Sequence, residues 1–161
     1  YGKFKIANLM SDYPFVAEPL PRPRIQINTE LDKLIARRIQ GEDWLKLQAE
    51  LIRYYQSEND FNNAAKVAGV VASAIPNDAK SHQVAGRLYM RANDLQLAYY
   101  HLKNSYQLEQ RNANYVLNYA HVLYLLNDYQ TSLNVLEQGQ KLGVEKDKFA
   151  KFINQVKRYI N

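Results

Sequence analysis

The side chains that could carry out catalysis or bind a metal ion are few in this sequence and stand far apart. The three histidines, His82, His101 and His121, show no His-Glu-x-x-His spacing and have no group of carboxylates at ligand spacing around them. Cysteine is absent, which excludes thiolate ligands and cysteine nucleophiles. The six glycines are scattered, so the chain contains neither a glycine-rich phosphate loop nor a Gly-x-Ser-x-Gly elbow. The sequence therefore predicts a protein that is not an enzyme, with no catalytic residues, no metal site and no cofactor.

The composition indicates a globular protein with a moderate preference for acidic partners. Of the 161 residues, 47% are apolar and 23% are charged, which is typical of a folded domain. The longest apolar stretch, residues 67–75, is far too short to cross a bilayer as a helix, so no transmembrane segment is predicted in this chain. A formal net charge of +5 helps to attract acidic molecules, but many ordinary proteins carry as much, and nucleic acid is not the expected partner.

One dipeptide, Asn-Asp, recurs three times at an interval of thirty-four residues, and each copy is followed by a large apolar residue. Asparagine tolerates the left-handed conformation that is needed just past the end of a helix. Aspartate can accept hydrogen bonds from the free N–H groups that begin the next helix. The pattern therefore predicts three hairpins of antiparallel helices joined by very short turns. The copies are Asn59-Asp60, Asn93-Asp94 and Asn127-Asp128, followed by Phe61, Leu95 and Tyr129.

Small residues at matching positions support close packing within these hairpins. Gly86 is expected to face Ala98, and Ala120 is expected to face Ser132, because each pair is separated by twelve residues across a turn. A glycine inside a helix costs about 1 kcal/mol relative to alanine, so Gly86 needs a packing reason of this kind.

The period and these positions resemble the tetratricopeptide repeat (TPR), in units 45–78, 79–112 and 113–146. The resemblance implies an all-α, right-handed solenoid of three helical hairpins with capping helices at its ends. The family's small residue at its eighth position falls on Ile52, Gly86 and Ala120, and its aromatic at the eleventh on Tyr55, Tyr89 and Leu123. The alanine at the twentieth position falls on Ala64, Ala98 and Ser132, and the closing proline on Pro76, Gln110 and Val144.

The two ends of the chain differ from the repeats. Residues 1–28 hold four of the five prolines and are expected to form an extended strap or linker, or else a ligand for a proline-binding groove. Residues 29–161 are expected to form the TPR-like domain, with an N-terminal capping helix over 29–40. A C-terminal capping helix over about 146–160 combines an apolar stripe with a basic face. That face is expected to be solvated, and contact with a membrane surface or nucleic acid is the alternative.

In TPR proteins the first helix of each unit lines a concave groove, and the resemblance implies which side chains here would bind a peptide. Arg53, Arg87 and His121 share the ninth position and form a predicted ladder, because arginine can bind a carboxylate through two hydrogen bonds. The full predicted peptide-binding set is Lys46, Arg53, Lys80, Gln83, Arg87, Arg91, Asn114, His121 and Tyr124.

One TPR subgroup, which clamps the terminal carboxylate of chaperones, is not expected here. Its lysine and asparagine positions in the first unit hold Ala49 and Arg53, and its second-unit asparagine position holds Val84. Its lysine and arginine in the third unit are replaced by Asn114 and Asn118.

The leading functional hypothesis is therefore a protein–protein interaction module, a scaffold or adaptor that binds an extended, acidic peptide or protein segment in a basic and polar groove. The alternative is an accessory, substrate-positioning TPR domain of a larger enzyme or assembly protein that could be membrane-anchored. The chain begins at Tyr1 without a methionine, so it is expected to be a piece of a longer protein or a processed form.

Overall fold

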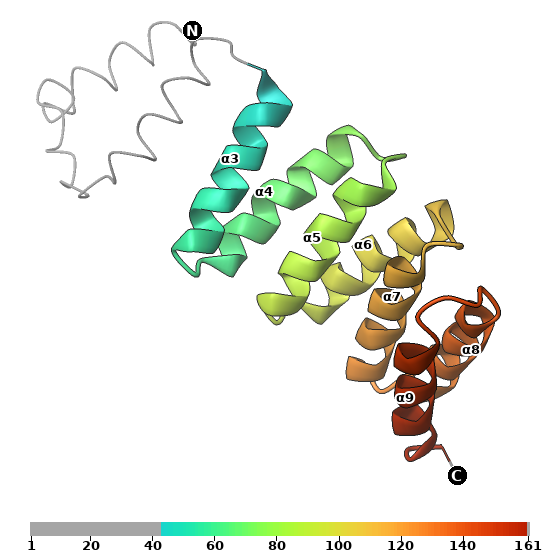
Figure 1. The fold of residues 1–161 in the computed structure, drawn as a ribbon. Helices are drawn as coiled ribbons and strands as arrows, with labels where there is room; N and C mark the ends of the chain where they lie inside the picture. Colours follow the sequence, from blue (N-terminus) through green and yellow to red (C-terminus); the bar gives the residue numbers. More distant parts are fainter. Residues whose placement is uncertain (1–42, 161) are drawn as a thin grey trace, which may run out of the picture.

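A computed structural model describes residues 43–160, and within this range the chain forms seven α-helices and no strand. Neighbouring helices along the chain pack against each other, so the molecule is a row of antiparallel helix pairs (Figure 1). This arrangement confirms the predicted all-α solenoid. The predicted strap at 1–28 and capping helix at 29–40 lie outside the described residues. The helices are α3 (Trp44–Ser57), α4 (Phe61–Ala74), α5 (Ala79–Arg91), α6 (Leu95–Leu108), α7 (Ala113–Leu125), α8 (Tyr129–Gln140) and α9 (Lys146–Lys157).

The three Asn-Asp turns have the conformation that their residue types predict. Asn59, Asn93 and Asn127 have φ values of 55°, 59° and 64°, in the left-handed region. In the second turn the Asp94 amide donates to the Tyr89 carbonyl at 2.9 Å, and the Asn93 amide donates to the Met90 carbonyl at 3.1 Å. This pair of bonds is the Schellman motif, and equivalent bonds close the other two turns. The aspartate carboxylates accept amide bonds from the next helix, so the predicted role of the dipeptide is confirmed.

Replacing Asn93 with alanine is expected to lower the free energy of unfolding by about 1 kcal/mol, because alanine pays the full steric cost of the left-handed conformation. Asn93→Gly is the matched control and should leave stability unchanged or slightly raised, since glycine adopts positive φ freely. Urea denaturation followed by circular dichroism measures both. Equal stability of the alanine and glycine variants would contradict the assigned role of Asn93.

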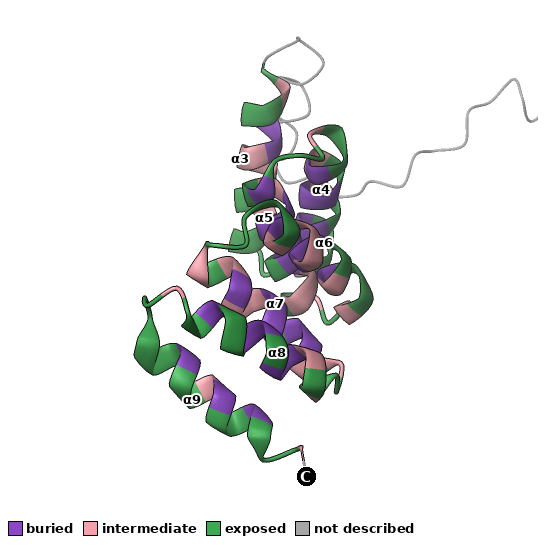
Figure 2. Cartoon of the chain, turned by 90° about the vertical axis from the view of Figure 1, so that its right-hand side faces the viewer, coloured by how far each residue is buried: buried purple, intermediate pink, exposed green. Residues whose placement is uncertain are grey.

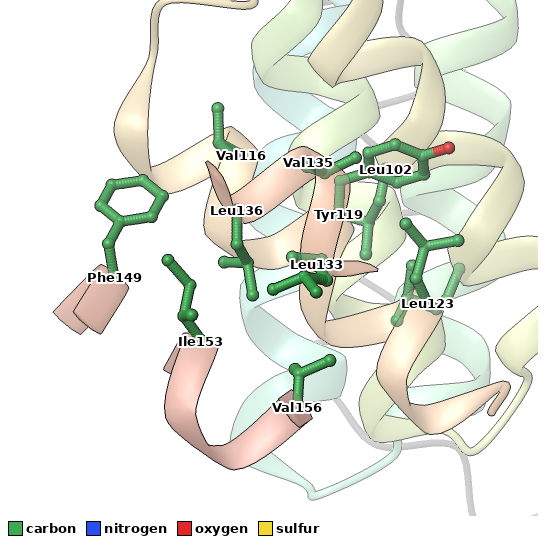
Figure 3. Packing of buried hydrophobic residues seen from close by; sticks show 13 residues of the cluster. Leu102, Val116, Tyr119, Leu123, Leu133, Val135, Leu136, Phe149, Ile153 and Val156 are labelled. Carbon is green, nitrogen blue, oxygen red and sulfur yellow. The ribbon is translucent and has the colours of Figure 1, made fainter. Parts of the chain in front are cut away.

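Buried residues occur on each of the helices α3 to α9 (Figure 2). They form two clusters of different character. The N-terminal cluster, between α3, α4 and α5, is built mainly from alanines, with Leu88 as its largest buried side chain. The C-terminal cluster joins α6, α7, α8 and α9 through larger side chains such as Leu102 and Leu136 (Figure 3). Helix α9 adds Phe149, Ile153 and Val156 to this cluster, so it caps the array as predicted.

Small residues set the spacing of the helices. The atoms nearest to a Cβ built on Gly86 belong to Leu102 of α6, one turn beyond Ala98, and Ala98 is itself fully buried. The facing of Gly86 and Ala98 stays a prediction. The Ala120–Ser132 pair is confirmed, because the buried Ser132 hydroxyl donates to the Ala120 carbonyl at 2.8 Å. Gly139 of α8 has a third such role, since its Cβ would meet Phe149 of α9 at 2.5 Å.

Across residues 43–160, none of the helices combines the length and the apolar character needed to cross a membrane.

Candidate functional site

The first surface hollow, which we call the N-terminal hollow, lies between α3, α4 and α5 and has a volume of about 350 Å³. Its lining is mainly apolar, and the exposed side chains of Arg53 and Lys80 stand on it. Asp78, the acidic residue in the lining, is occupied as the N-cap of α5: its carboxylate accepts the Ser81 amide at 3.0 Å and also the Ser81 hydroxyl. The lining is Leu45, Ala49, Ile52, Arg53, Ala68, Val71, Asp78, Lys80, Ser81 and Val84.

A second hollow of about 350 Å³, the C-terminal hollow, lies between α7 and α9. Aromatic rings form much of its lining. The Phe152 ring meets the rings of His121 and Tyr124 edge-on, at centroid distances of 6.0 and 5.7 Å. The Gln155 side-chain amide donates to the Tyr124 hydroxyl at 3.3 Å. Lysines are the charged residues in the lining, which is made of Leu117, Asn118, His121, Tyr124, Lys148, Lys151, Phe152 and Gln155.

Helix α9 contributes to this hollow because it presents two different faces, a buried apolar one and a mainly polar one that carries Phe152. Residues 149, 153 and 156 are buried in the C-terminal cluster, whereas residues 148, 151, 152 and 155 recur at the i, i+3, i+4, i+7 spacing of one helix face and line the hollow. Gly139 lets α9 approach α8 closely, since any side chain there would collide with Phe149. The position of α9 is therefore fixed by core packing, and its lysines are presented beside α7.

The structure places seven of the nine predicted binding residues at exposed positions and half-buries Tyr124. Gln83 is different: it is only 6% exposed, and its side-chain oxygen accepts a hydrogen bond from the Ser105 hydroxyl at 3.0 Å. Gln83 therefore ties α5 to α6, and we remove it from the candidate surface as a correction. The exposed residues are Lys46, Arg53, Lys80, Arg87, Arg91, Asn114 and His121.

The predicted ladder is not gathered in one hollow. Arg53 borders the N-terminal hollow, His121 borders the C-terminal hollow, and Arg87 is exposed on α5 and lines neither. Arg91 lies over the Phe61 ring, with its guanidinium carbon 4.2 Å from the ring centroid, so it also has a packing role between α5 and α4.

His121 differs from the arginines in charge as well. The His121 side chain is exposed overall, but its ring packs edge-on against Phe152 and loses part of its hydration there. This desolvation lowers the pKa of His121 below its ordinary value of 6.5, so the imidazole is predominantly neutral at neutral pH. The positive charge at this end of the surface comes instead from Lys148 and Lys151, which the sequence analysis assigned to a solvated outer face. The spacing of the sequence could have identified these two lysines, because Phe152 and Gln155 lie on the same face of the helix as they do.

The other two histidines form a buried pair between α5 and α6. His82 Nε2 lies 2.8 Å from the Pro76 carbonyl oxygen and must donate to it, so His82 Nδ1 accepts from His101 Nδ1 at 3.0 Å. The Tyr89 ring stacks on His101 at a centroid distance of 5.7 Å. Burial, and then the neighbouring His82, lower the pKa of His101 to about 4. The pair links α5 to α6 through the bond between its two rings. Within the described residues no group of three or more His, Cys, Asp or Glu side chains could hold a metal ion.

The fold is shared with solved TPR domains of low sequence identity. MamA is 21% identical with a TM-score of 0.57, over 64% of this chain and 60% of MamA, so the chain spans about three fifths of that protein. The Sgt2 TPR domain from Aspergillus fumigatus is 14% identical with a TM-score of 0.61, over 88% of this chain and 85% of that domain. The second TPR domain of human RPAP3, solved with the HSP70 peptide SGPTIEEVD, is 10% identical with a TM-score of 0.61, over 68% of this chain and 92% of that domain.

No curated protein matches the sequence. The family model described as "Anaphase-promoting complex, cyclosome, subunit 3" matches residues 57–139, which is just over half of the chain. The matched segment runs from the end of α3 almost to the end of α8 and includes all three Asn-Asp turns. With this match and the shared TPR fold, the chain belongs to the TPR-like family that carries this description.

Proposed function

We propose that this chain is a protein-interaction module that binds an extended, acidic peptide segment along the surface formed by α3, α5 and α7. The observation that carries the proposal is the N-terminal hollow, where an apolar floor is combined with two exposed cations, Arg53 and Lys80. The nearby carboxylate of Asp78 is already engaged by Ser81. An acidic peptide with an apolar side chain would satisfy both parts of this hollow.

The solved relatives support an acidic ligand but differ in its recognition. RPAP3 domains were solved with chaperone peptides ending in EEVD or containing it, and the yeast Sti1 TPR2B domain was solved with an Hsp70 peptide. In this chain Ala49 and Val84 stand at two positions of the chaperone clamp, and both line the N-terminal hollow. We therefore propose an acidic segment that inserts an apolar side chain, in place of a clamped chaperone terminus.

Removing both cations, as Arg53→Gln with Lys80→Gln, is expected to weaken binding of an acidic probe at least tenfold. The probe is a synthetic peptide in which one leucine has a Glu-Asp pair on each side. Its affinity is measured by calorimetric titration. Each charge-assisted contact is worth roughly 1.5–3 kcal/mol, and about 1.4 kcal/mol corresponds to a factor of ten.

The control removes two exposed lysines that line neither hollow, Lys66→Gln on α4 with Lys141→Gln after α8, and it lowers the net charge equally. Equal binding by both double variants would contradict the proposed site. A matching loss of melting temperature in the Arg53/Lys80 variant would instead assign these side chains a structural role.

A second candidate function is an accessory, substrate-positioning module of a larger enzyme or assembly protein. It is favoured by the description of the matching family, which names a subunit of a complex. The full-length gene distinguishes the two candidates, because a catalytic motif or membrane segment in it would support the second one.

A further inference from the structure

We infer that the C-terminal hollow is a second binding site for an acidic peptide segment, in which the capping helix α9 supplies the positive charge. The inference rests on the proposed function and extends it to a helix outside the three repeats. Its occupant would be a stretch of peptide with an apolar side chain flanked by aspartate or glutamate.

The floor of the hollow suits an apolar side chain. Leu117 and Tyr124 of α7 and Phe152 of α9 line it, and none of the three is fully buried. The edge-on contacts of Phe152 with His121 and Tyr124 hold the rings in place, so the floor exists before a ligand arrives. A volume of about 350 Å³ is at the lower end of the range for ligand pockets and accommodates a peptide side chain or two.

The rim of the hollow suits carboxylates. Lys148 and Lys151 are both exposed and three residues apart, so they project from one face of α9. Lys148 forms an exposed ion pair with Glu145 at 3.1 Å, a contact that is weak and exchangeable in water. Across residues 43–160 no ion pair involves Lys151, and no aspartate or glutamate lines the hollow. The rim therefore carries positive charge, which Glu145 offsets only in part through its exposed contact with Lys148.

Three uncharged groups can complete the recognition of a peptide backbone. Asn118 and Gln155 offer amide donors and acceptors, and Gln155 already donates to the Tyr124 hydroxyl. His121 is predominantly neutral because burial lowers its pKa, so it offers one donor and one acceptor. A peptide carries both kinds of group at regular intervals, whereas the phosphodiester backbone of DNA offers acceptors alone.

Two lysines over an aromatic floor fit a peptide better than a polyanion. Binding through phosphates draws on an extended set of cations, and the remaining basic residues of α9, such as Lys146 and Lys157, do not line the hollow. These two residues therefore provide a matched control, because they lie on the same helix, are exposed, and carry the same charge.

The test compares Lys148→Gln with Lys151→Gln against Lys146→Gln with Lys157→Gln in the full chain. The fluorescein-labelled probe peptide with two Glu-Asp pairs around one leucine is titrated with each protein, and fluorescence anisotropy gives its affinity. Both double changes are made in a chain that already carries Arg53→Gln with Lys80→Gln, so that the N-terminal hollow does not bind the probe in their place. In this background the first double change is expected to weaken binding about tenfold, and the second less than twofold. Added salt should weaken binding to the unmodified chain and the control more than to the first variant.

The Arg53/Lys80 variant separates this inference from the proposed function. Binding that depends on Arg53 and Lys80 but not on the Lys148/Lys151 pair would overturn the inference and leave the proposed function standing. Dependence on the α9 pair alone would support the inference and remove the N-terminal hollow from the proposal. Three further results would overturn the inference. They are equal losses of affinity in the two α9 variants, efficient displacement of the probe by duplex DNA or anionic vesicles, and no binding of the probe by the unmodified chain.

Discussion

Replacing Gly86 with leucine is expected to lower the free energy of unfolding by about 3 kcal/mol or more, the largest effect of any single change considered. A Cβ at this position would stand 2.5 Å from Cγ of Leu102 and 3.1 Å from its backbone nitrogen. Leu102 is fully buried in the C-terminal cluster, so its side chain has no free space into which to turn. The backbone of α6 would therefore have to move away from α5.

Two further variants make the reason for this loss testable by urea denaturation. Arg87→Leu places the same side chain on the next, exposed residue of α5 and should change stability by less than about 0.5 kcal/mol. Gly86→Ala gains about 1 kcal/mol of helix propensity but still brings its Cβ against Leu102. We expect the alanine variant to be less stable than the unmodified chain. A more stable alanine variant would show that α5 and α6 are not as close as the structure places them.

Lowering the pH from 7 to 5 is expected to reduce the free energy of unfolding by about 2 kcal/mol through the buried imidazole of His101. In the folded chain burial and the His82 neighbour lower the pKa of His101 from 6.5 to about 4. The unfolded chain therefore binds more protons in this interval. The stability from the neutral imidazole is complete above pH 6.5 and is lost as the pH falls toward 4.

The position of His101 explains why its imidazole resists protonation. Its Nδ1 already donates to His82 Nδ1 at 3.0 Å, so an added proton goes to the outer nitrogen, Nε2. That proton would place a charge on a side chain that is only 4% exposed and packed beside the His82 ring. Protonation of His101 therefore disfavours the packing of α5 on α6.

Urea denaturation at pH 7 and pH 5 measures this effect, and His101→Leu isolates it. The variant should be less stable at pH 7, because it leaves His82 Nδ1 without a donor, yet its stability should fall less on acidification. His121, whose pKa is also lowered by burial, adds to the pH dependence in the same direction in both proteins. An equally steep pH dependence in the His101→Leu variant would assign the acid sensitivity to other groups.

The parts of this structure that could be predicted from the sequence are those fixed by neighbouring residues. The Asn-Asp turns depend on the left-handed preference of asparagine and on the capping bond of aspartate, which both act within four residues. The apolar stripe of α9, with Phe149 and Ile153, likewise follows from helical periodicity. These local features predicted the all-α solenoid, and the structure confirms it.

The features that could not be predicted depend on the exact rotation and offset of packed helices. The atoms nearest to Gly86 belong to Leu102, a contact that depends on how the Leu102 side chain lies between α5 and α6 and that the spacing of positions did not reveal. Gln83 is turned into the hairpin by its bond to Ser105, twenty-two residues away. The C-terminal hollow exists only because α9 docks beside α7, and sequence spacing carries no record of that contact.

The Asn-Asp turn also makes the solenoid divisible into interchangeable pieces. Each turn ends one helix and begins the next with the same two residues, and all of its bonds are made within a few positions. Excision of residues 61–94 would join Asp60 directly to Leu95 and recreate the sequence Asn-Asp-apolar at the new junction. Recombination between two such turns therefore recreates a hairpin at the junction, here between α3 and α6. A chain built in this way can change its length, and with it the number of hollows it presents, without requiring a new turn.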